Sequence, residues 1–228
     1  MVEYWQKIIL DSWNAYKQNF RVLFGAYLII HIFLTYPQFL VSTVGLNQDL
    51  SNLSEFTSPA NILLLLAILF LSGGLWLGGV LLSYCALTNK PLVFKNLFEQ
   101  FYLLPRLAIK YCISTVLGIV IFMVIKNIVI SAALFFIIYA ILFFFYDYLI
   151  LFHQLKFADA VRENFYLVSS NIMLIIQYGC LYLLVGMVFI LLPIIGPLLA
   201  QSFFMVLGVC FFLNVKNIQS VKEINSPE

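Results

Sequence analysis

The sequence predicts an all-α, polytopic membrane protein, and composition and hydropathy carry that prediction. Hydrophobic residues make up 64% of the 228 residues and charged residues only 10%, and the mean hydropathy is +1.04. A soluble domain is about half apolar and about a quarter charged, and a chain of this length buries only about three quarters of its unfolded surface. The composition therefore excludes a soluble globular domain, a disordered chain and a nucleic-acid binder that depends on a basic face.

Six apolar stretches match the roughly 20 residues that a helix needs to cross the hydrocarbon layer. Lys126 and Asn127 separate the third stretch from the fourth, and the run from Pro193 to Pro197 separates the fifth from the sixth. Backbone groups in lipid must be satisfied within the segment, so these stretches are predicted to be helices. They run approximately over 22–44, 62–87, 107–125, 128–152, 172–192 and 194–215.

The positive residues indicate how these six transmembrane helices are oriented. An even number of spans places both termini on one side, and every lysine and arginine except Lys126 falls on that side. The loop from Gly45 to Asn61, on the other side, carries no cation. Because cytoplasmic loops carry the excess of Lys and Arg, we predict that both termini are cytoplasmic.

The segments before spans one, three and five resemble one another. The first carries Asp11-Ser-Trp13 and the third Glu163-Asn-Phe165, and each is followed at the same distance by an asparagine, whereas Glu99-Gln-Phe101 in the second matches more loosely. We therefore predict a single integral membrane domain built from three pseudo-repeats, each with one cytoplasmic-side helix and two spans. Parallel repeats of even span number keep one orientation. The repeats cover about 1–88, 89–152 and 153–216, before a polar, frayed tail at 217–228.

Each of these three segments is amphipathic, with aromatic residues opposite basic ones at helical spacing. Such helices can lie flat at the lipid headgroups, with Trp and Phe inserted and Lys or Arg turned to water or anionic lipid. Alternatively, they extend the following span and pack on one another. The side chains predicted to meet the membrane surface are Trp5, Trp13, Lys17, Phe101, Arg162 and Phe165.

Polar side chains within predicted spans are costly in lipid and are therefore candidates for function. Asp147 and Lys110 lie at similar depth in neighbouring spans, which favours a structural ion pair over a proton-coupled or substrate-binding role. His31 is expected to be a neutral histidine bonded to a neighbouring helix, with a proton relay as the alternative. Gln38 and Gln201 lie toward the outer half of their spans, where they could line an outward cavity.

The second span carries the clearest signal for helix packing. Gly74 and Gly78 have GxxxG spacing, and Gly79 follows directly. Small residues let helix backbones approach closely in membranes. The pattern predicts close packing with another span or with a second copy of the chain, and it does not decide between them.

The sequence carries no recognisable catalytic motif. It has no P-loop, dinucleotide-binding glycine pattern, zinc-protease motif, nucleophile elbow or carboxylate pair. The four cysteines, Cys85, Cys112, Cys180 and Cys210, lie far apart in apolar runs and suggest neither a disulfide framework nor a zinc site. We therefore expect a protein that is not an enzyme and has no cofactor and no metal.

Several stretches carry a resemblance to a known family. They are the segment that ends at Phe20, the glycine-bearing run Ser72–Gly79, the linker around Pro91 and Phe98, and the run Phe157–Asn171. Together they are similar to the YciC-like bacterial inner-membrane proteins and, more distantly, to the membrane domain of some glycerophosphodiester phosphodiesterases. The resemblance covers nearly the whole chain. It implies a six-span protein of the bacterial inner (plasma) membrane and supplies no catalytic residues.

Three functional hypotheses follow from these patterns. The leading hypothesis is a non-enzymatic inner-membrane protein that organises the envelope through membrane lipids or a partner protein, which includes a second copy of the chain; no nucleic acid is expected. The second is a small transporter or channel with an outward cavity near Gln38 and Gln201, coupled through His31 or Asp147. The third is an accessory subunit of a membrane complex.

Overall fold

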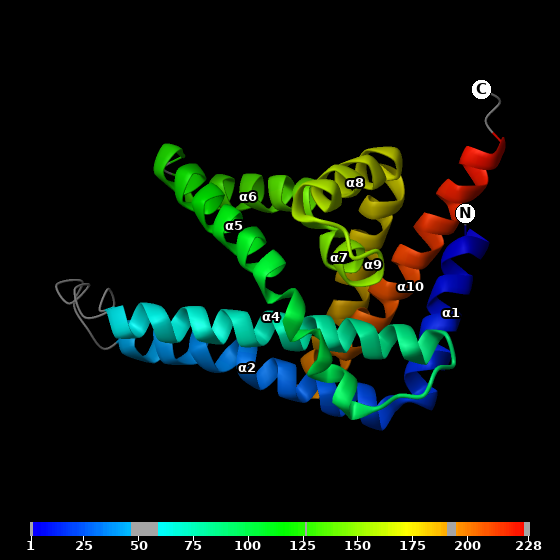
Figure 1. Ribbon diagram of the computed structural model, residues 1–228, viewed down its shortest axis with the longest axis horizontal. Coiled ribbons are helices and arrows are strands. Elements are labelled where there is room, and N and C mark those ends of the chain that lie inside the picture. Colours follow the sequence, from blue (N-terminus) through cyan, green and yellow to red (C-terminus); the bar gives the residue numbers. More distant parts are fainter. Residues whose placement is uncertain (1, 47–58, 126, 191–194, 226–228) are drawn as a thin grey trace.

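The computed structural model describes the backbone of residues 2–46, 59–125, 127–190 and 195–225, and the side chains within 2–33, 70–189 and 196–217 except those of residues 122, 126 and 128. Every regular element in these ranges is a helix (Figure 1). In chain order they are α1 (Val2–Gln18), α2 (Phe20–Leu46), α4 (Pro59–Leu87), the 3-10 helices η2 (Phe94–Leu97) and η3 (Glu99–Leu103), α5 (Leu104–Val124), α6 (Ile128–Phe143), α7 (Tyr146–Phe152), α8 (Phe157–Ser170), α9 (Ile172–Ile190) and α10 (Ile195–Asn225).

Five stretches among the described residues are long and apolar enough to cross a membrane, and they correspond to the second to sixth predicted spans. The prediction of an all-α protein with several membrane-spanning helices is therefore confirmed. The first predicted span falls in α2, of which only Phe20–Phe33 has described side chains and forms a shorter apolar helix. The five stretches are Phe70–Leu87, Phe94–Ile121, Val129–Phe152, Ile172–Phe189 and Gly196–Asn217.

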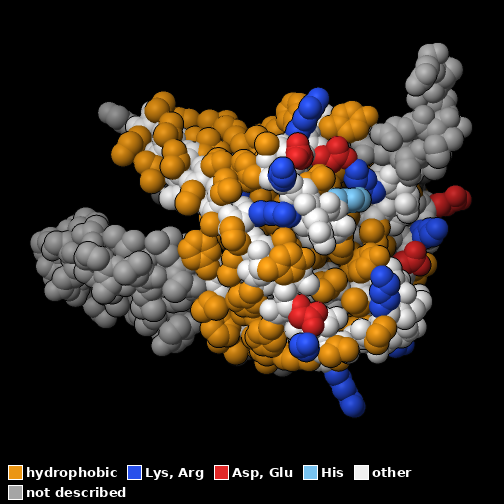
Figure 2. Space-filling model, viewed as in Figure 1, with side chains coloured by type: hydrophobic (Ala, Val, Ile, Leu, Met, Phe, Trp, Pro, Cys, Tyr) orange, Lys and Arg blue, Asp and Glu red, His pale blue; other side chains and the backbone are white. Residues whose placement is uncertain are grey.

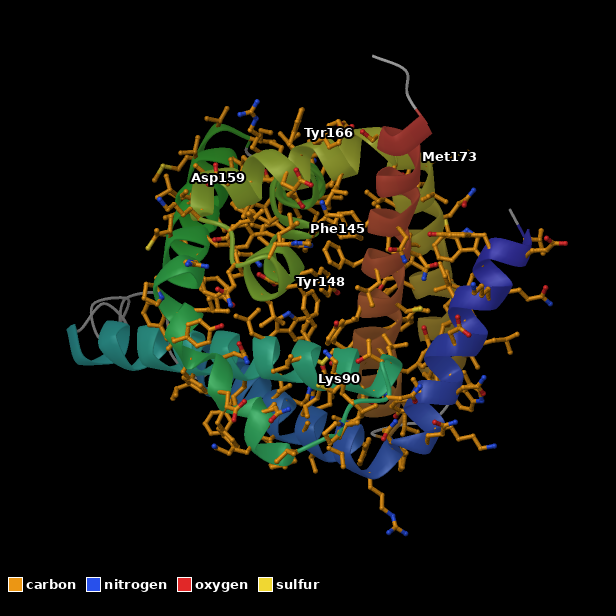
Figure 3. All side chains as sticks on the ribbon, turned by 45° about the vertical axis from the view of Figure 1, so that its right-hand side comes forward. Lys90, Phe145, Tyr148, Asp159, Tyr166 and Met173 are labelled. Carbon is orange, nitrogen blue, oxygen red and sulfur yellow. The ribbon has the colours of Figure 1, made fainter. Side chains whose placement is uncertain are left out.

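The apolar helices form three hairpins: α2 with α4, α5 with α6, and α9 with α10. The α2–α4 hairpin runs across the α9–α10 hairpin in both views of the ribbon (Figures 1 and 3), and the C-terminal end of α5 and the N-terminal end of α6 extend outward in Figure 1. The helices therefore cross one another rather than forming a parallel bundle. Most of Phe70–Leu87 in α4 and of Gly196–Asn217 in α10 is buried inside the protein, whereas the apolar stretch Ile172–Phe189 of α9 has no buried residue.

The helices that precede the hairpins pack in a cyclic order. Helix α1 lies along α10, η2 and η3 lie against α4, and α8 lies against α6. Each therefore packs on the second helix of the hairpin before it, and α1 closes the ring by packing on the last hairpin. The amphipathic segments therefore pack on neighbouring hairpins, and whether their exposed side chains meet a membrane surface stays a prediction.

The aligned asparagines Asn19 and Asn171 make the same contact at two helix junctions. The side-chain amide of Asn19 donates to the Ala15 carbonyl at 3.0 Å, and that of Asn171 donates to the Leu167 carbonyl at 3.0 Å. At each position the preceding amphipathic helix ends and the apolar helix begins without an intervening loop.

Two predicted boundaries differ from the structure. The fourth span is not one helix, because α6 ends at Phe143 and α7 begins at Tyr146. The segment predicted as a frayed tail instead continues α10 to Asn225. The predicted turn at 193–197 lies mostly outside the described residues.

Candidate functional site

The break between α6 and α7 is held by a buried asparagine of α8. The Asn164 side chain, which has no exposed surface, donates to the Ile141 carbonyl at 2.7 Å and accepts from the Phe145 amide at 2.6 Å. A broken helix leaves backbone groups without intrahelical partners, and Asn164 satisfies one on each side of this break. The break turns the chain so that Asp147 falls in the first turn of α7.

The predicted ion pair between the third and fourth spans is present. The Lys110 Nζ of α5 lies 2.8 Å and 2.9 Å from the two carboxylate oxygens of Asp147. The rings of Tyr111, Tyr139 and Tyr146 surround the ammonium group, with centroids 5.9, 5.5 and 5.7 Å from it. The Lys110 side chain is only 4% exposed and that of Asp147 is 17% exposed, so Asp147 is the more accessible of the two residues.

This ion pair forms the floor of a groove of about 380 Å³ between α4 and the α5–α6 hairpin. We call it the lateral groove; its lining residues are Ser72, Trp76, Lys110, Tyr111, Phe136, Tyr139, Ala140, Phe143, Phe144 and Asp147. The helices that supply its walls also carry apolar side chains on the surface, where Val116 and Val120 of α5 and Ile137 of α6 are more than half exposed. The groove thus combines one charged pair with aromatic walls.

A second cavity, of about 350 Å³, lies where α2, α4, α7, α9 and α10 meet. We call it the tyrosine cavity; its lining residues are Tyr27, Trp76, Phe144, Phe145, Tyr148, Tyr178, Tyr182, Gln201, Phe204, Met205, Gly208 and Phe211. Figure 3 shows Phe145 and Tyr148 between α7 and α10. Trp76 and Phe144 line both this cavity and the lateral groove, so the two spaces share a wall.

Gln201, one of the predicted polar residues, lies in the tyrosine cavity. Its side-chain oxygen accepts a hydrogen bond from the Tyr27 hydroxyl. His31 lies one turn beyond Tyr27 on α2, with the two ring centroids 6.1 Å apart. The structure therefore brings Gln201 next to the turn that carries His31 and keeps both apart from the Lys110–Asp147 pair. The side chain of Gln38 lies outside the described residues.

The glycines of α4 pack against elements of the same chain. A Cβ atom at Gly78 would overlap the carbonyl oxygen of Leu97 in η2, and one at Gly74 would lie 3.0 Å from the Phe101 ring. A Cβ atom at Gly79 would lie 2.6 Å from the sulfur of Met205 on α10. The GxxxG pattern therefore accommodates the 3-10 helices that precede α5. The spacing predicted packing against another span or a second copy of the chain, and it did not indicate these 3-10 helices.

The predicted membrane-surface residues fall into two groups. Trp5 is stacked on Phe211 at 5.4 Å and donates from Nε1 to the Gln177 side chain at 2.8 Å, and Phe101 packs against α4. These two residues therefore serve packing within the protein, because α1 and η3 lie against neighbouring hairpins. The side chains that remain exposed are Trp13, Lys17, Arg162 and Phe165.

Charged side chains gather on one part of the surface (Figure 2). In this view they lie over the half of the molecule that holds α1 and α8, whereas the projecting α5–α6 hairpin is hydrophobic. Among the described residues, the lysines and arginines lie in α1, the first turn of α2, the connection from α4 to α5, the first two turns of α5, the segment from 156 to 162, and the C-terminal part of α10.

Comparison with protein-family models, curated proteins and solved structures yields no match for this chain. The resemblance to the YciC-like family therefore stays a prediction.

Sequence reasoning missed several residues that shape these two spaces. Neither Asn164 nor the cavity residues Tyr148 and Tyr178 are among the candidate residues that the sequence indicates. Asn164 shares one face of α8 with Ala160 and Leu167, and all three residues are fully buried. A polar residue in line with two apolar ones was the available signal for the role of Asn164.

Proposed function

We propose that the chain is a non-enzymatic, multi-pass membrane protein that binds membrane lipid, and that it organises lipid or a partner protein in the bacterial inner membrane. The observation that carries this proposal is the lateral groove. An amphiphile needs a polar site next to an apolar surface, and the groove combines the Lys110–Asp147 pair with aromatic walls from α5 and α6, two helices that also carry exposed apolar side chains.

The accessible charge in the groove favours a headgroup with an ammonium group. The Asp147 side chain is 17% exposed whereas that of Lys110 is almost fully covered, so the negative partner is the more accessible one to a ligand. Hydrogen bonds between an ammonium group and a carboxylate are about twice as strong as neutral ones. An ethanolamine headgroup can donate to Asp147 while its acyl chains lie along α5 and α6.

The proposal includes six spans, both termini in the cytoplasm, and three pseudo-repeats. The gathering of charged side chains away from the α5–α6 hairpin supports this topology, because lysines and arginines favour the cytoplasmic side. The equivalent contacts of Asn19 and Asn171, together with the cyclic packing of the three preceding segments, support the repeats.

Native mass spectrometry of the full chain tests the proposed lipid site. The variant Lys110→Met/Asp147→Leu replaces the pair with apolar groups of similar size, and Lys95→Met/Glu99→Leu does the same for an exposed pair outside the groove, in which the charged atoms lie 3.6 Å apart. We expect one phosphatidylethanolamine per chain in the wild type and in the Lys95/Glu99 control, and its loss in the Lys110/Asp147 variant. Equal retention in all three proteins would contradict the proposal.

Transport is a second candidate function, and the broken fourth span favours it. Discontinuous helices in transporters commonly form the substrate site, and the α6–α7 break contributes Phe144 to both the lateral groove and the tyrosine cavity. Flux of a solute into proteoliposomes that Asp147→Asn abolishes would support transport. Unchanged flux in that variant would exclude a coupling role for Asp147.

A further inference from the structure

We propose that the tyrosine cavity binds an uncharged, planar, lipid-soluble molecule that carries carbonyl oxygens, which is the chemistry of a quinone. This site is separate from the proposed lipid site in the lateral groove. Its volume of about 350 Å³ lies within the range of small-molecule pockets, which are mostly apolar and aromatic with a few placed polar groups.

Two tyrosine hydroxyls converge on one face of α10. At Gly208, the position that a Cβ atom would take lies 2.5 Å from the hydroxyl of Tyr148 and 3.3 Å from that of Tyr178. These tyrosines come from α7 and α9, so two separate elements direct their polar ends to the same point. Any larger residue at 208 would displace them, and the glycine therefore creates a cradle for two hydroxyl groups.

A third polar group lies two turns away on the same face of α10. The Tyr27 hydroxyl donates to the side-chain oxygen of Gln201, which directs the NH₂ group of that amide away from Tyr27. An elongated planar ligand with a carbonyl oxygen at each end can accept from Tyr148 or Tyr178 at one end and from Gln201 at the other.

The cavity favours a neutral ligand over a cation. No charged side chain occurs among the described residues that line it, and an unpaired charge in an apolar site is strongly disfavoured. Cation recognition by aromatic residues needs open ring faces, but phenylalanines of α10 cover one face of each of three tyrosine rings. The stacked pairs are Tyr178 with Phe211 at 4.8 Å, Tyr182 with Phe204 at 4.0 Å, and Tyr148 with Phe212 at 5.1 Å.

Trp76 gives an optical signal for binding, because it lines the cavity and quinones quench indole fluorescence; it also lines the lateral groove, so a variant of that groove serves as a control below. The experiment titrates menadione into the full-length protein in detergent and follows tryptophan emission. We expect saturable quenching in the wild type and loss of the saturable part in Trp76→Phe. The double variant Tyr148→Phe/Tyr178→Phe keeps both rings and should bind at least tenfold more weakly.

Two glycine variants on facing helices provide a matched pair. Gly208→Ala places a methyl group on the two hydroxyls and should abolish saturable quenching, whereas Gly179→Ala, where a Cβ atom meets nothing within 4 Å, should leave it unchanged. Lys110→Met/Asp147→Leu should also leave it unchanged, which separates this site from the lipid groove. Quenching that stays linear in every protein would overturn the proposal.

Two further ligands test the chemical class. Naphthalene has the same fused ring without carbonyl oxygens and should not displace menadione. Displacement by naphthalene would show that shape alone selects the ligand, and displacement by tetraphenylphosphonium would show an aromatic cation site. Either result would overturn the proposal.

Discussion

The side-chain oxygen of Asn164 accepts a hydrogen bond of 2.6 Å from the backbone amide of Phe145, across the break between α6 and α7. The same carboxamide donates to Ile141 on the other side of the break. One residue of α8 therefore replaces hydrogen bonds that a continuous helix would make for itself. The break in turn places Phe144 between the lateral groove and the tyrosine cavity.

Removing this bridge should destabilise the protein. Asn164→Ala leaves a buried donor and a buried acceptor without partners, and each costs about 1–3 kcal/mol. We expect a loss of about 2–5 kcal/mol, measured by chemical unfolding in detergent micelles. Asn171→Ala is the matched control. Asn171 is also buried, but its side chain makes a local hydrogen bond to the carbonyl of Leu167, four residues earlier in the chain. A loss for Asn164→Ala no larger than that of the control would contradict the bridging role.

The part of the fold that follows from local sequence was predictable, and the part that depends on tertiary contact was not. Hydropathy alone predicted the apolar helices. The similar depth of Lys110 and Asp147 in neighbouring predicted spans predicted their ion pair. The role of Asn164 depends on α8 lying against α6, which no local pattern encodes. The partner of Gly78 was equally hidden, because GxxxG spacing indicates close approach without indicating which element approaches.

The buried ion pair should behave differently from its two single variants. Lys110→Met leaves the Asp147 carboxylate unpaired in an apolar site, and breaking a buried pair in this way costs about 3–5 kcal/mol. Replacing both residues, as in Lys110→Met/Asp147→Leu, should restore stability to near the wild-type value or above it. A double-mutant cycle of unfolding free energies measures the coupling. The exposed pair of Lys95 and Glu99 should show a coupling below about 0.5 kcal/mol.

Alanine at two glycines should change stability in opposite directions. Gly78→Ala forces a methyl group onto the Leu97 carbonyl and should separate η2 from α4, with a loss of about 1–3 kcal/mol from overpacking. Gly186→Ala in α9 meets nothing within 4 Å and should gain up to about 1 kcal/mol from helix propensity. Melting temperatures that move in the same direction for both variants would contradict this packing.

The exposed cations should enrich anionic lipid around the protein. Lys7, Lys17, Lys95 and Arg162 have exposed side chains, and each basic residue near an anionic surface contributes about 1 kcal/mol. Replacing all four by Gln should reduce the preference for spin-labelled phosphatidylglycerol over phosphatidylcholine, measured by electron paramagnetic resonance in proteoliposomes. Neutralising Glu3, Asp11 and Asp159, which are also exposed, should raise the same preference. An unchanged preference in the cation variant would show that these residues do not meet lipid.

Stability should fall as the solution becomes more acidic, through His153. This residue ends α7, with its ring 6.3 Å from that of Phe212. Burial lowers the pKa of His153 below its usual 6.5, the Lys216 ammonium lowers it further, and the Glu163 carboxylate partly opposes both effects. The unfolded chain therefore binds a proton at a higher pH than the folded protein does.

The sign of the pH effect follows from this order of proton binding. Above pH 6.5 the imidazole is neutral in both states, and stability is independent of this group. As the pH falls through 6.5 the unfolded state is protonated first, which lowers its free energy relative to that of the folded state and so reduces the stability of the folded protein. The loss stops once the pH passes below the folded pKa. We expect melting temperatures to fall between pH 7.5 and pH 5.5 in the wild type and to fall less in His153→Gln. Lys216→Met should also reduce the slope, because it removes one cause of the lowered pKa, and an unaltered slope in both variants would assign the pH dependence to other groups.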